Sequence, residues 1–212
     1  MRVVAAIVGL SLLGTHVQAS LAQNSTETIR FAIMRDGSPI GTHDIVINRA
    51  GPETTVTLTT DLTVKVLFVT AYRLEQTTSE RWVNGVLVSL NSATDNNGTR
   101  HKVSVTPKAP GLEVEVDGTV TRVDKNVVPG SLWNPAFLKR SVMLDTQDGK
   151  VFPFTVVNGG PEQLTLKGQP VTATRYTIKG RYTQDVWYDQ QSRLVRAKLI
   201  ATDGSAIVYD LI

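Results

Sequence analysis

The sequence predicts an all-β protein whose main element is a curved, largely antiparallel sheet of open, barrel-like shape, accompanied by one short helix. Two observations lead to this prediction. Apolar and polar residues alternate with a period of two in most segments, and turn dipeptides such as Asn84-Gly85 and Asn97-Gly98 separate these segments. A β-sandwich is the alternative, because it uses similar strands in two layers.

The clearest strands lie at the C-terminal end. Residues 182–188 and 194–202 are separated by Asp189-Gln190-Gln191-Ser192, and Asp203-Gly204 leads into the last segment. An Asp-Gly dipeptide favours a two-residue hairpin, in which both central residues have φ > 0. We therefore expect three consecutive antiparallel strands here.

The N-terminal half shows the same pattern. Strands at 29–34 and 40–49 are expected to form a first hairpin, and in residues 54–68 the apolar side chains keep to one parity. A straight strand of that length would span roughly 50 Å, whereas about 20 Å is usual. It must bend or break into two, which indicates a strongly curved sheet. Further strands are expected at 72–83, 86–93, 101–106 and 112–116. The last of these has an acidic solvent face, which is typical of a position near a sheet edge.

The region 128–140 departs from the alternating pattern. Asn134 is a suitable N-cap and Pro135 suits the first helical position, so residues 135–140 are predicted to form a helix of about two turns that covers one open end of the sheet. Beyond it, strands are expected at 142–145, 150–157, 163–167 and 171–179, with turns at Asp148-Gly149, Gly159-Gly160 and Gly168-Gln169.

Residues 1–22 have the layout of a secretory signal peptide. Arg2 precedes an apolar run, and small residues stand at Ser20 and Ala22. The run is shorter than the ~20 apolar residues that a membrane-spanning helix needs. We expect cleavage after Ala22, or else after Ala19, which leaves a single β-rich domain at 23–212. The mature protein is then exported, periplasmic or secreted, and does not span the membrane.

The composition excludes several classes of protein. The chain has no cysteine, so it contains no disulfide, no thiol nucleophile and no site for lipid attachment at a cysteine. Its 22 Lys and Arg are interspersed with 19 Asp and Glu, and this pattern gives no reason to expect a nucleic-acid partner. No cofactor and no metal are expected, because neither His43 nor His101 stands in a metal-ligand spacing. Both histidines are predicted to lie at the surface.

The sequence contains no recognisable catalytic motif. His43 is followed by Asp44, but adjacent residues of a strand point to opposite faces and cannot share one site. Ser205 lacks the flanking pattern of a nucleophile elbow. Scattered carboxylates such as Glu80 and Asp189 are the remaining candidates for hydrolysis. The sequence thus favours a protein without enzymatic activity, and no catalytic residue is predicted.

Three tryptophans stand beside polar or turn residues, and we interpret them chiefly as caps on the ends of the core. The second interpretation is an aromatic cluster that binds a ligand. A curled sheet would in addition have a concave side lined by aliphatic residues, which could hold an apolar molecule. The ligand-binding candidates are Trp82, Trp133, Trp187, Tyr188, Val64, Val66 and Phe68.

Several of these motifs also carry a family likeness. In chain order they are FAIMRDGSPIGTH, ERWVNGVL, TDNNG, SLWNP, DTQDG, WYDQQSRLV and DGSAIVYDL. Together they resemble the exported bacterial proteins grouped as Domain of Unknown Function 6134, over nearly the whole mature chain. The resemblance implies a bacterial envelope or secreted location and a β-rich fold, and it brings no catalytic residues. Gln190-Gln191-Ser192 is a departure, since a glycine is expected after the WYD motif.

Three functions are consistent with these observations. The first is a soluble exported protein that binds an apolar or lipid-like small molecule, or an envelope protein, on the curved sheet. The second is an envelope hydrolase that uses the scattered carboxylates. The third is an integral outer-membrane barrel, which the charged residues on many strands disfavour.

Overall fold

The structure, a computed structural model, describes residues 24–212, so the predicted leader at 1–22 lies outside the described residues. It contains sixteen strands and one short 3-10 helix, which confirms the predicted all-β class. Among the described residues, no helix is long and apolar enough to cross a membrane. The elements are β1 (Ser25–Arg35), β2 (Ser38–Ala50), β3 (Glu53–Val66), β4 (Val69–Val83), β5 (Val86–Asn96), β6 (Thr99–Lys108), β7 (Gly111–Val116), β8 (Thr119–Val123), β9 (Val128–Pro129), η1 (Pro135–Lys139), β10 (Val142–Leu144), β11 (Val151–Pro153), β12 (Thr155–Leu166), β13 (Gln169–Lys179), β14 (Thr183–Asp189), β15 (Leu194–Ile200) and β16 (Ala206–Leu211).

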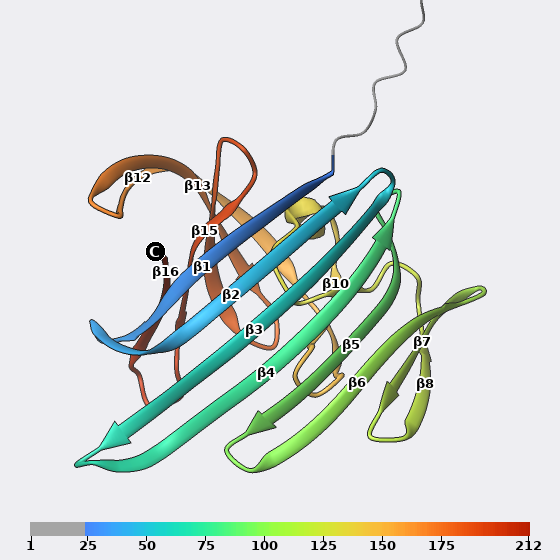
Figure 1. Ribbon diagram of the computed structural model, residues 1–212, viewed down its shortest axis with the longest axis horizontal. Helices are drawn as coiled ribbons and strands as arrows, with labels where there is room; N and C mark the ends of the chain where they lie inside the picture. The colour runs from blue at the N-terminus through green and yellow to red at the C-terminus, as the bar shows by residue number, and fades with distance from the viewer. Residues whose placement is uncertain (1–23) are drawn as a thin grey trace, which may run out of the picture.

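Thirteen strands form one continuous sheet in the order β12-β13-β14-β15-β16-β1-β2-β3-β4-β5-β6-β7-β8. Strands β1 and β16 pair antiparallel, which joins the two ends of the described chain in the middle of the sheet. Figure 1 shows the sheet curling, so that β13 and β15 lie behind the wall formed by β1 to β4. The barrel-like prediction is therefore confirmed, and the sandwich alternative does not apply because one large sheet curls in place of two stacked layers.

The long strand predicted at 54–68 is continuous and does not break. It forms β3, which runs for 14 residues from Glu53 to Val66. Its pairing with β4 shifts register between Val64 and Lys65, and similar shifts interrupt the β1–β2, β4–β5, β12–β13 and β14–β15 ladders. Such bulges add an extra residue to one strand and increase the local twist. They allow long strands to bend with the sheet while keeping their hydrogen bonds.

Two predicted turns are wrong in detail. Gly159-Gly160 is not a turn but the bulge within a single strand, β12, where the register shifts between Asn158 and Gly160. Asp203-Gly204 is not a two-residue hairpin, because β15 ends at Ile200 and β16 starts at Ala206. The Asp203 carboxylate accepts hydrogen bonds from the backbone N–H and hydroxyl of Ser205, which favours the longer loop.

Strand β8 was not expected from the sequence. It follows an Asp117-Gly118 turn and forms one end of the sheet order, next to β7. Its residues are mostly exposed, so it lacks the alternation that marks a half-buried strand. The expectation that residues 112–116 lie near an edge is confirmed, since β7 is the last strand but one.

The inner segment, residues 124–154, runs through the space inside the curve. It holds a small sheet of order β11-β10-β9, in which β9 and β10 are parallel, and the helix η1. Asn134 caps η1 as predicted, because its Oδ1 accepts a hydrogen bond of 3.0 Å from the Ala136 N–H. Phe137 and Met143 belong to the largest hydrophobic cluster, which joins β1–β3 to β13–β15. The segment therefore fills one part of the interior and leaves the rest open.

Candidate functional site

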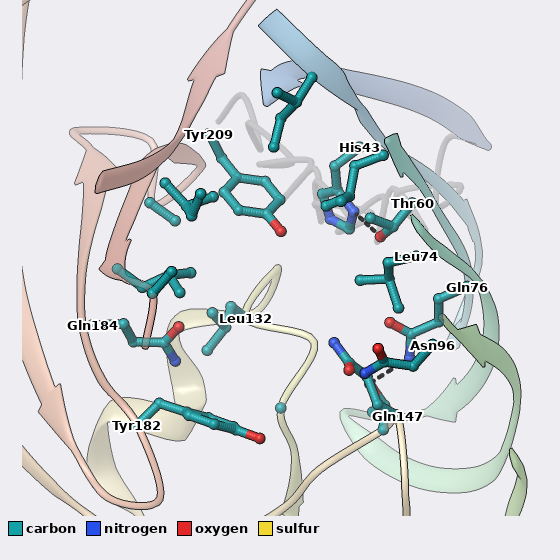
Figure 2. A pocket seen from close by; sticks show the side chains of 18 of the residues that line it. His43, Thr60, Leu74, Gln76, Asn96, Leu132, Gln147, Tyr182, Gln184 and Tyr209 are labelled. Atoms are coloured by element: carbon teal, nitrogen blue, oxygen red, sulfur yellow. Dashed lines mark hydrogen bonds between the residues drawn. The ribbon is translucent and has the colours of Figure 1, made fainter. Parts of the chain in front are cut away.

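The curled sheet encloses a cavity of about 730 Å³, which lies between β1–β5, β14–β16 and the inner segment. Figure 2 shows its interior. This volume falls within the range of about 300–1,000 Å³ that is typical of small-molecule sites. The apolar part of the wall consists of Phe31, Ile40, Leu58, Leu62, Val64, Val66, Ala71, Leu74, Leu132, Met143, Phe152, Leu194, Ala197, Leu199, Ala201 and Ile207.

Strand β3 shows how the sequence builds this wall. Successive side chains of a strand point to opposite faces. Leu58, Leu62 and Val64 line the cavity, whereas Thr57 and Asp61 lie on the other parity and are exposed to solvent. The alternation that predicts the strand therefore also separates its cavity face from its outer face.

One side of the cavity is polar. Gln76 on β4 donates hydrogen bonds of 3.1 Å to the hydroxyls of Ser92 and Thr146, and the second of these joins the sheet to the inner segment. Asn96 and Gln147 lie beside it in the wall, as Figure 2 shows. The cavity therefore offers neutral hydrogen-bonding groups here, and Gln184 and Tyr182 lie on the facing wall (Figure 2).

His43 lines the cavity from β2, contrary to the predicted surface position. Its Nδ1 lies 2.8 Å from the Thr60 hydroxyl, and its ring contacts Phe31 and Tyr209 with centroids 6.0 and 5.7 Å apart. Burial disfavours the imidazolium and lowers the pKa of His43 to about 4. Its ring is partly accessible, and that surface faces the cavity. The residue is therefore neutral at physiological pH.

Tyr209 on β16 packs edge to face against the His43 ring, and its hydroxyl is directed into the open space (Figure 2). Burial disfavours the phenolate and raises the pKa of Tyr209 to about 12. The side chain keeps its proton at neutral pH and can donate a hydrogen bond to a ligand.

The charged groups at the cavity are paired. The Arg35 guanidinium lies 2.5 Å from the Asp203 carboxylate, where β1 ends near the β15–β16 loop. Arg181 lies 2.9 Å from Asp145, whose pKa is raised because burial disfavours its charge. Each cation in the wall region thus has a carboxylate within ion-pair distance. The cavity carries no excess charge that would select a charged ligand.

The family model described as Domain of unknown function (DUF6134) matches residues 31–212. The chain belongs to this family. A search of curated proteins found no significant match. Among solved structures, the chain is similar to the crystal structure of a "Beta-barrel-like Protein of Domain of Unknown Function DUF1849" from Brucella abortus, with a TM-score of 0.63 and 9% identity over 87% of this chain and 94% of that chain. At that identity the likeness shows a shared fold and no more.

The predicted ligand-binding residues of this DUF6134 protein do not gather at one site. Val64 and Val66 lie in the cavity wall. Phe68 is 99% exposed at the tip of the β3–β4 hairpin. Tyr188 is buried in the core, where its hydroxyl donates a hydrogen bond to the Leu132 carbonyl oxygen.

The tryptophans do not form one aromatic cluster. Trp82 and Trp133 pack edge to face, and both indole N–H groups donate to the same Glu80 oxygen, at 2.8 and 2.7 Å. They border a second, smaller groove at the opposite end of the sheet from the cavity mouth. Trp187 lies in a separate hydrophobic cluster and donates to Glu162.

The two carboxylates considered for hydrolysis have structural contacts instead. Burial raises the pKa of Glu80, which holds the two indoles. Asp189 accepts hydrogen bonds from the backbone N–H groups of Gln191 and Arg193 and thereby shapes the β14–β15 turn. Ser192 takes φ = 62° there, in the place where glycine is expected. Within residues 24–212, no group of three or more acidic or histidine side chains is arranged to hold a metal.

Sequence reasoning missed the polar residues of the cavity. His43, Gln76 and Tyr209 come from strands that are distant in the sequence, and each looks like an ordinary strand residue there. A weak signal existed at Tyr209, which keeps the apolar parity of its strand together with Ile207. The pairing of β16 with β1 brings these residues to one cavity.

Proposed function

We propose that this protein binds an uncharged, largely apolar molecule of lipid-like chemistry in its cavity, as an exported component of the bacterial cell envelope. One observation carries the proposal, namely a cavity of about 730 Å³ whose wall is more apolar than polar and whose charged groups are already paired. Binding an apolar group there removes its surface from water, which is favourable at about 25 cal/mol per Å².

The polar groups of the wall would orient the bound molecule. The Tyr209 hydroxyl and the side chains around Gln76 can hydrogen-bond a neutral polar group such as a hydroxyl or an ester. A free carboxylate or phosphate would find no unpaired cation among the wall residues. The proposed ligand is therefore neutral along the part that enters the cavity.

The signal-peptide pattern of residues 1–22 supports export. The structural contacts of Glu80 and Asp189 leave the hydrolase alternative without a specific observation in its favour.

The proposal is tested by titrating the purified protein with a neutral fluorescent probe such as phenylnaphthylamine, and by native mass spectrometry after incubation with a monoacylglycerol. We expect saturable binding of one probe molecule and a mass shift of one lipid. Ala71 lines the cavity near its mouth, so Ala71→Trp narrows the entrance and should weaken probe binding at least tenfold.

The matched control is Ala93→Trp, because Ala93 is also an exposed alanine, on the neighbouring strand β5, but does not line the cavity. It should bind the probe as the unchanged protein does. Absence of saturable binding, or equal affinities for the two variants, would overturn the proposal.

A further inference from the structure

The β3–β4 hairpin extends beyond the rest of the sheet. The last pair between β2 and β3 is Gly41 with Leu62, and the first pair between β4 and β5 is Leu74 with Asn96. Residues 63–72 therefore pair only within the hairpin, whereas the Arg73 carbonyl oxygen still accepts a hydrogen bond from the Asn97 N–H. Figure 1 shows their turn at the lower left, well past the neighbouring turns. At about 3.3 Å per residue, Val66 at the start of the tip stands roughly 13 Å beyond the last pair that β3 shares with β2.

The tip of this extension is apolar and open to solvent. Its four consecutive residues are Val66, Leu67, Phe68 and Val69, with 54%, 88%, 99% and 68% of their surfaces exposed. A single exposed apolar side chain is ordinary, but a contiguous group on a projecting element indicates an interaction site.

The backbone conformation at the tip is one that bulky apolar residues adopt only at a cost in stability. Leu67 and Phe68 have φ of 48° and 69°, a region that bulky residues rarely adopt. The other turns of this kind place glycine second, at Gly37, Gly85, Gly98, Gly118 and Gly168. Bulky apolar residues thus occupy a turn that Asn-Gly would form more easily. Strain of this kind is expected where a residue serves a purpose other than stability.

The shape and charge of the tip favour a lipid surface over a protein. The projection is narrow and convex, so its side chains spread in several directions and fit a fluid phase better than a flat complementary surface. The cross-strand pairing of Val66 with Val69 satisfies backbone groups within the hairpin, which lowers the cost of leaving water. The projecting residues 63–72 contain Lys65 and no acidic residue, which favours contact with anionic headgroups, whereas Arg73 at the base of the hairpin is paired with Glu75.

The same hairpin borders the cavity mouth. Val66, Ala71 and Tyr72 belong to the cavity wall, and Tyr182 lies across from them, half exposed. Tyrosine is favoured at membrane interfaces, because its ring is apolar and its hydroxyl is polar. A surface that covered the tip would therefore lie close to the entrance of the cavity.

We propose that the tip formed by Val66, Leu67, Phe68 and Val69 inserts into the interfacial region of a lipid bilayer, between the headgroups and the acyl chains, and holds the cavity mouth at the membrane surface. This interaction goes beyond binding in the cavity and does not require it. The bound protein remains a peripheral one, since only the tip enters the lipid.

A fluorescent label at the tip tests the insertion directly. The chain has no cysteine, so Phe68→Cys provides a single attachment site for an environment-sensitive dye. With vesicles of phosphatidylethanolamine and phosphatidylglycerol, we expect a blue shift of the emission and protection from iodide quenching. The matched control is Val86→Cys, which is 63% exposed and lies at the opposite end of the sheet. Its label should show neither change.

Leu67→Asn combined with Phe68→Gly provides the second arm. This double variant replaces the apolar turn by the Asn-Gly pair found at residues 84–85 and 97–98, so it should fold at least as well as the unchanged chain. We expect its partitioning onto the vesicles to fall at least tenfold, with binding of the neutral probe in the cavity retained.

Unchanged vesicle binding by the double variant, or equal dye responses at positions 68 and 86, would overturn the insertion. So would a tip that binds no vesicles but is cross-linked to an envelope protein, which would assign the tip to a protein partner. Loss of vesicle binding leaves the cavity titration unaffected, so this proposal and the proposed ligand binding fail separately.

Discussion

The burial of His43 depends on which face of β2 it occupies. Its neighbour Asp44 points to the other face of β2 and pairs with Arg30 through two hydrogen bonds of 2.8 Å. Adjacent residues of a strand point to opposite faces, so His43 and Asp44 are separated as predicted. The face that carries His43 is the concave one, however, so the imidazole lies among Phe31, Thr60 and Tyr209 and not in bulk water.

The low pKa of His43 gives the stability of the protein a defined pH dependence. The unfolded histidine takes up a proton near pH 6.5, whereas the folded one does so only near pH 4. The unfolded state therefore binds more protons in this window, and stability falls as the pH is lowered from about 6.5 to about 4. His43→Gln should lose about 2 kcal/mol less than the unchanged chain between pH 7 and pH 4.5, measured by urea unfolding at both pH values. An equal loss in both proteins would show that the burial of His43 is not the source of this pH dependence.

At the scale of elements, the close approach of β2 and β3 depends on Gly41. This residue lies opposite Leu62, and it follows the bulge at which the β1–β2 register shifts between Ile33 and Met34. A Cβ added at Gly41 would lie 2.1 Å from the backbone oxygen of Asp61. Backbone atoms cannot move aside as a flexible side chain can, so the strands would have to separate.

Gly41→Ala should accordingly destabilise the fold by about 2 kcal/mol, the usual cost of overpacking. The free energy of unfolding by urea is the measurement. Thr42→Ala serves as the control, because Thr42 is exposed on the same strand. This substitution should lower the free energy of unfolding by less than about 1 kcal/mol. A neutral Gly41→Ala would show that β2 and β3 have room for a methyl group between them.

At the scale of the molecule, the inner segment links two hydrophobic clusters. Phe137 and Met143 pack with the strands from both ends of the chain, whereas Leu144 packs with Leu90 and Val114 of β5 and β7. Adjacent residues of β10 thus serve different clusters. The sheet and the segment inside it are expected to unfold together, because neither cluster is complete without β10.

Leu144→Ala tests this coupling. Leu144 is 2% exposed, so its truncation should cost about 3 kcal/mol, whereas Val151→Ala, at its exposed partner in the small sheet, should cost little. Tryptophan fluorescence and far-ultraviolet circular dichroism should report the same urea midpoint for Leu144→Ala. Two separate midpoints would mean that the inner segment unfolds independently of the sheet.

The sequence predicted most of the strands, most of the turns and the short helix, because the period of two and dipeptides such as Asn84-Gly85 act through local backbone geometry, whereas β8 lacks the alternation and was not expected. It also determined that Val64 and Val66 share a face. Which face is concave and which residues meet there depends on the assembled sheet, since His43, Gln76 and Tyr209 come together through the pairing of β16 with β1 and the curl of thirteen strands. The long apolar parity of residues 54–68 indicated that the sheet curves, but the path of the curve sums small twists and bulges over all thirteen strands, so no local pattern tells which residues meet inside it.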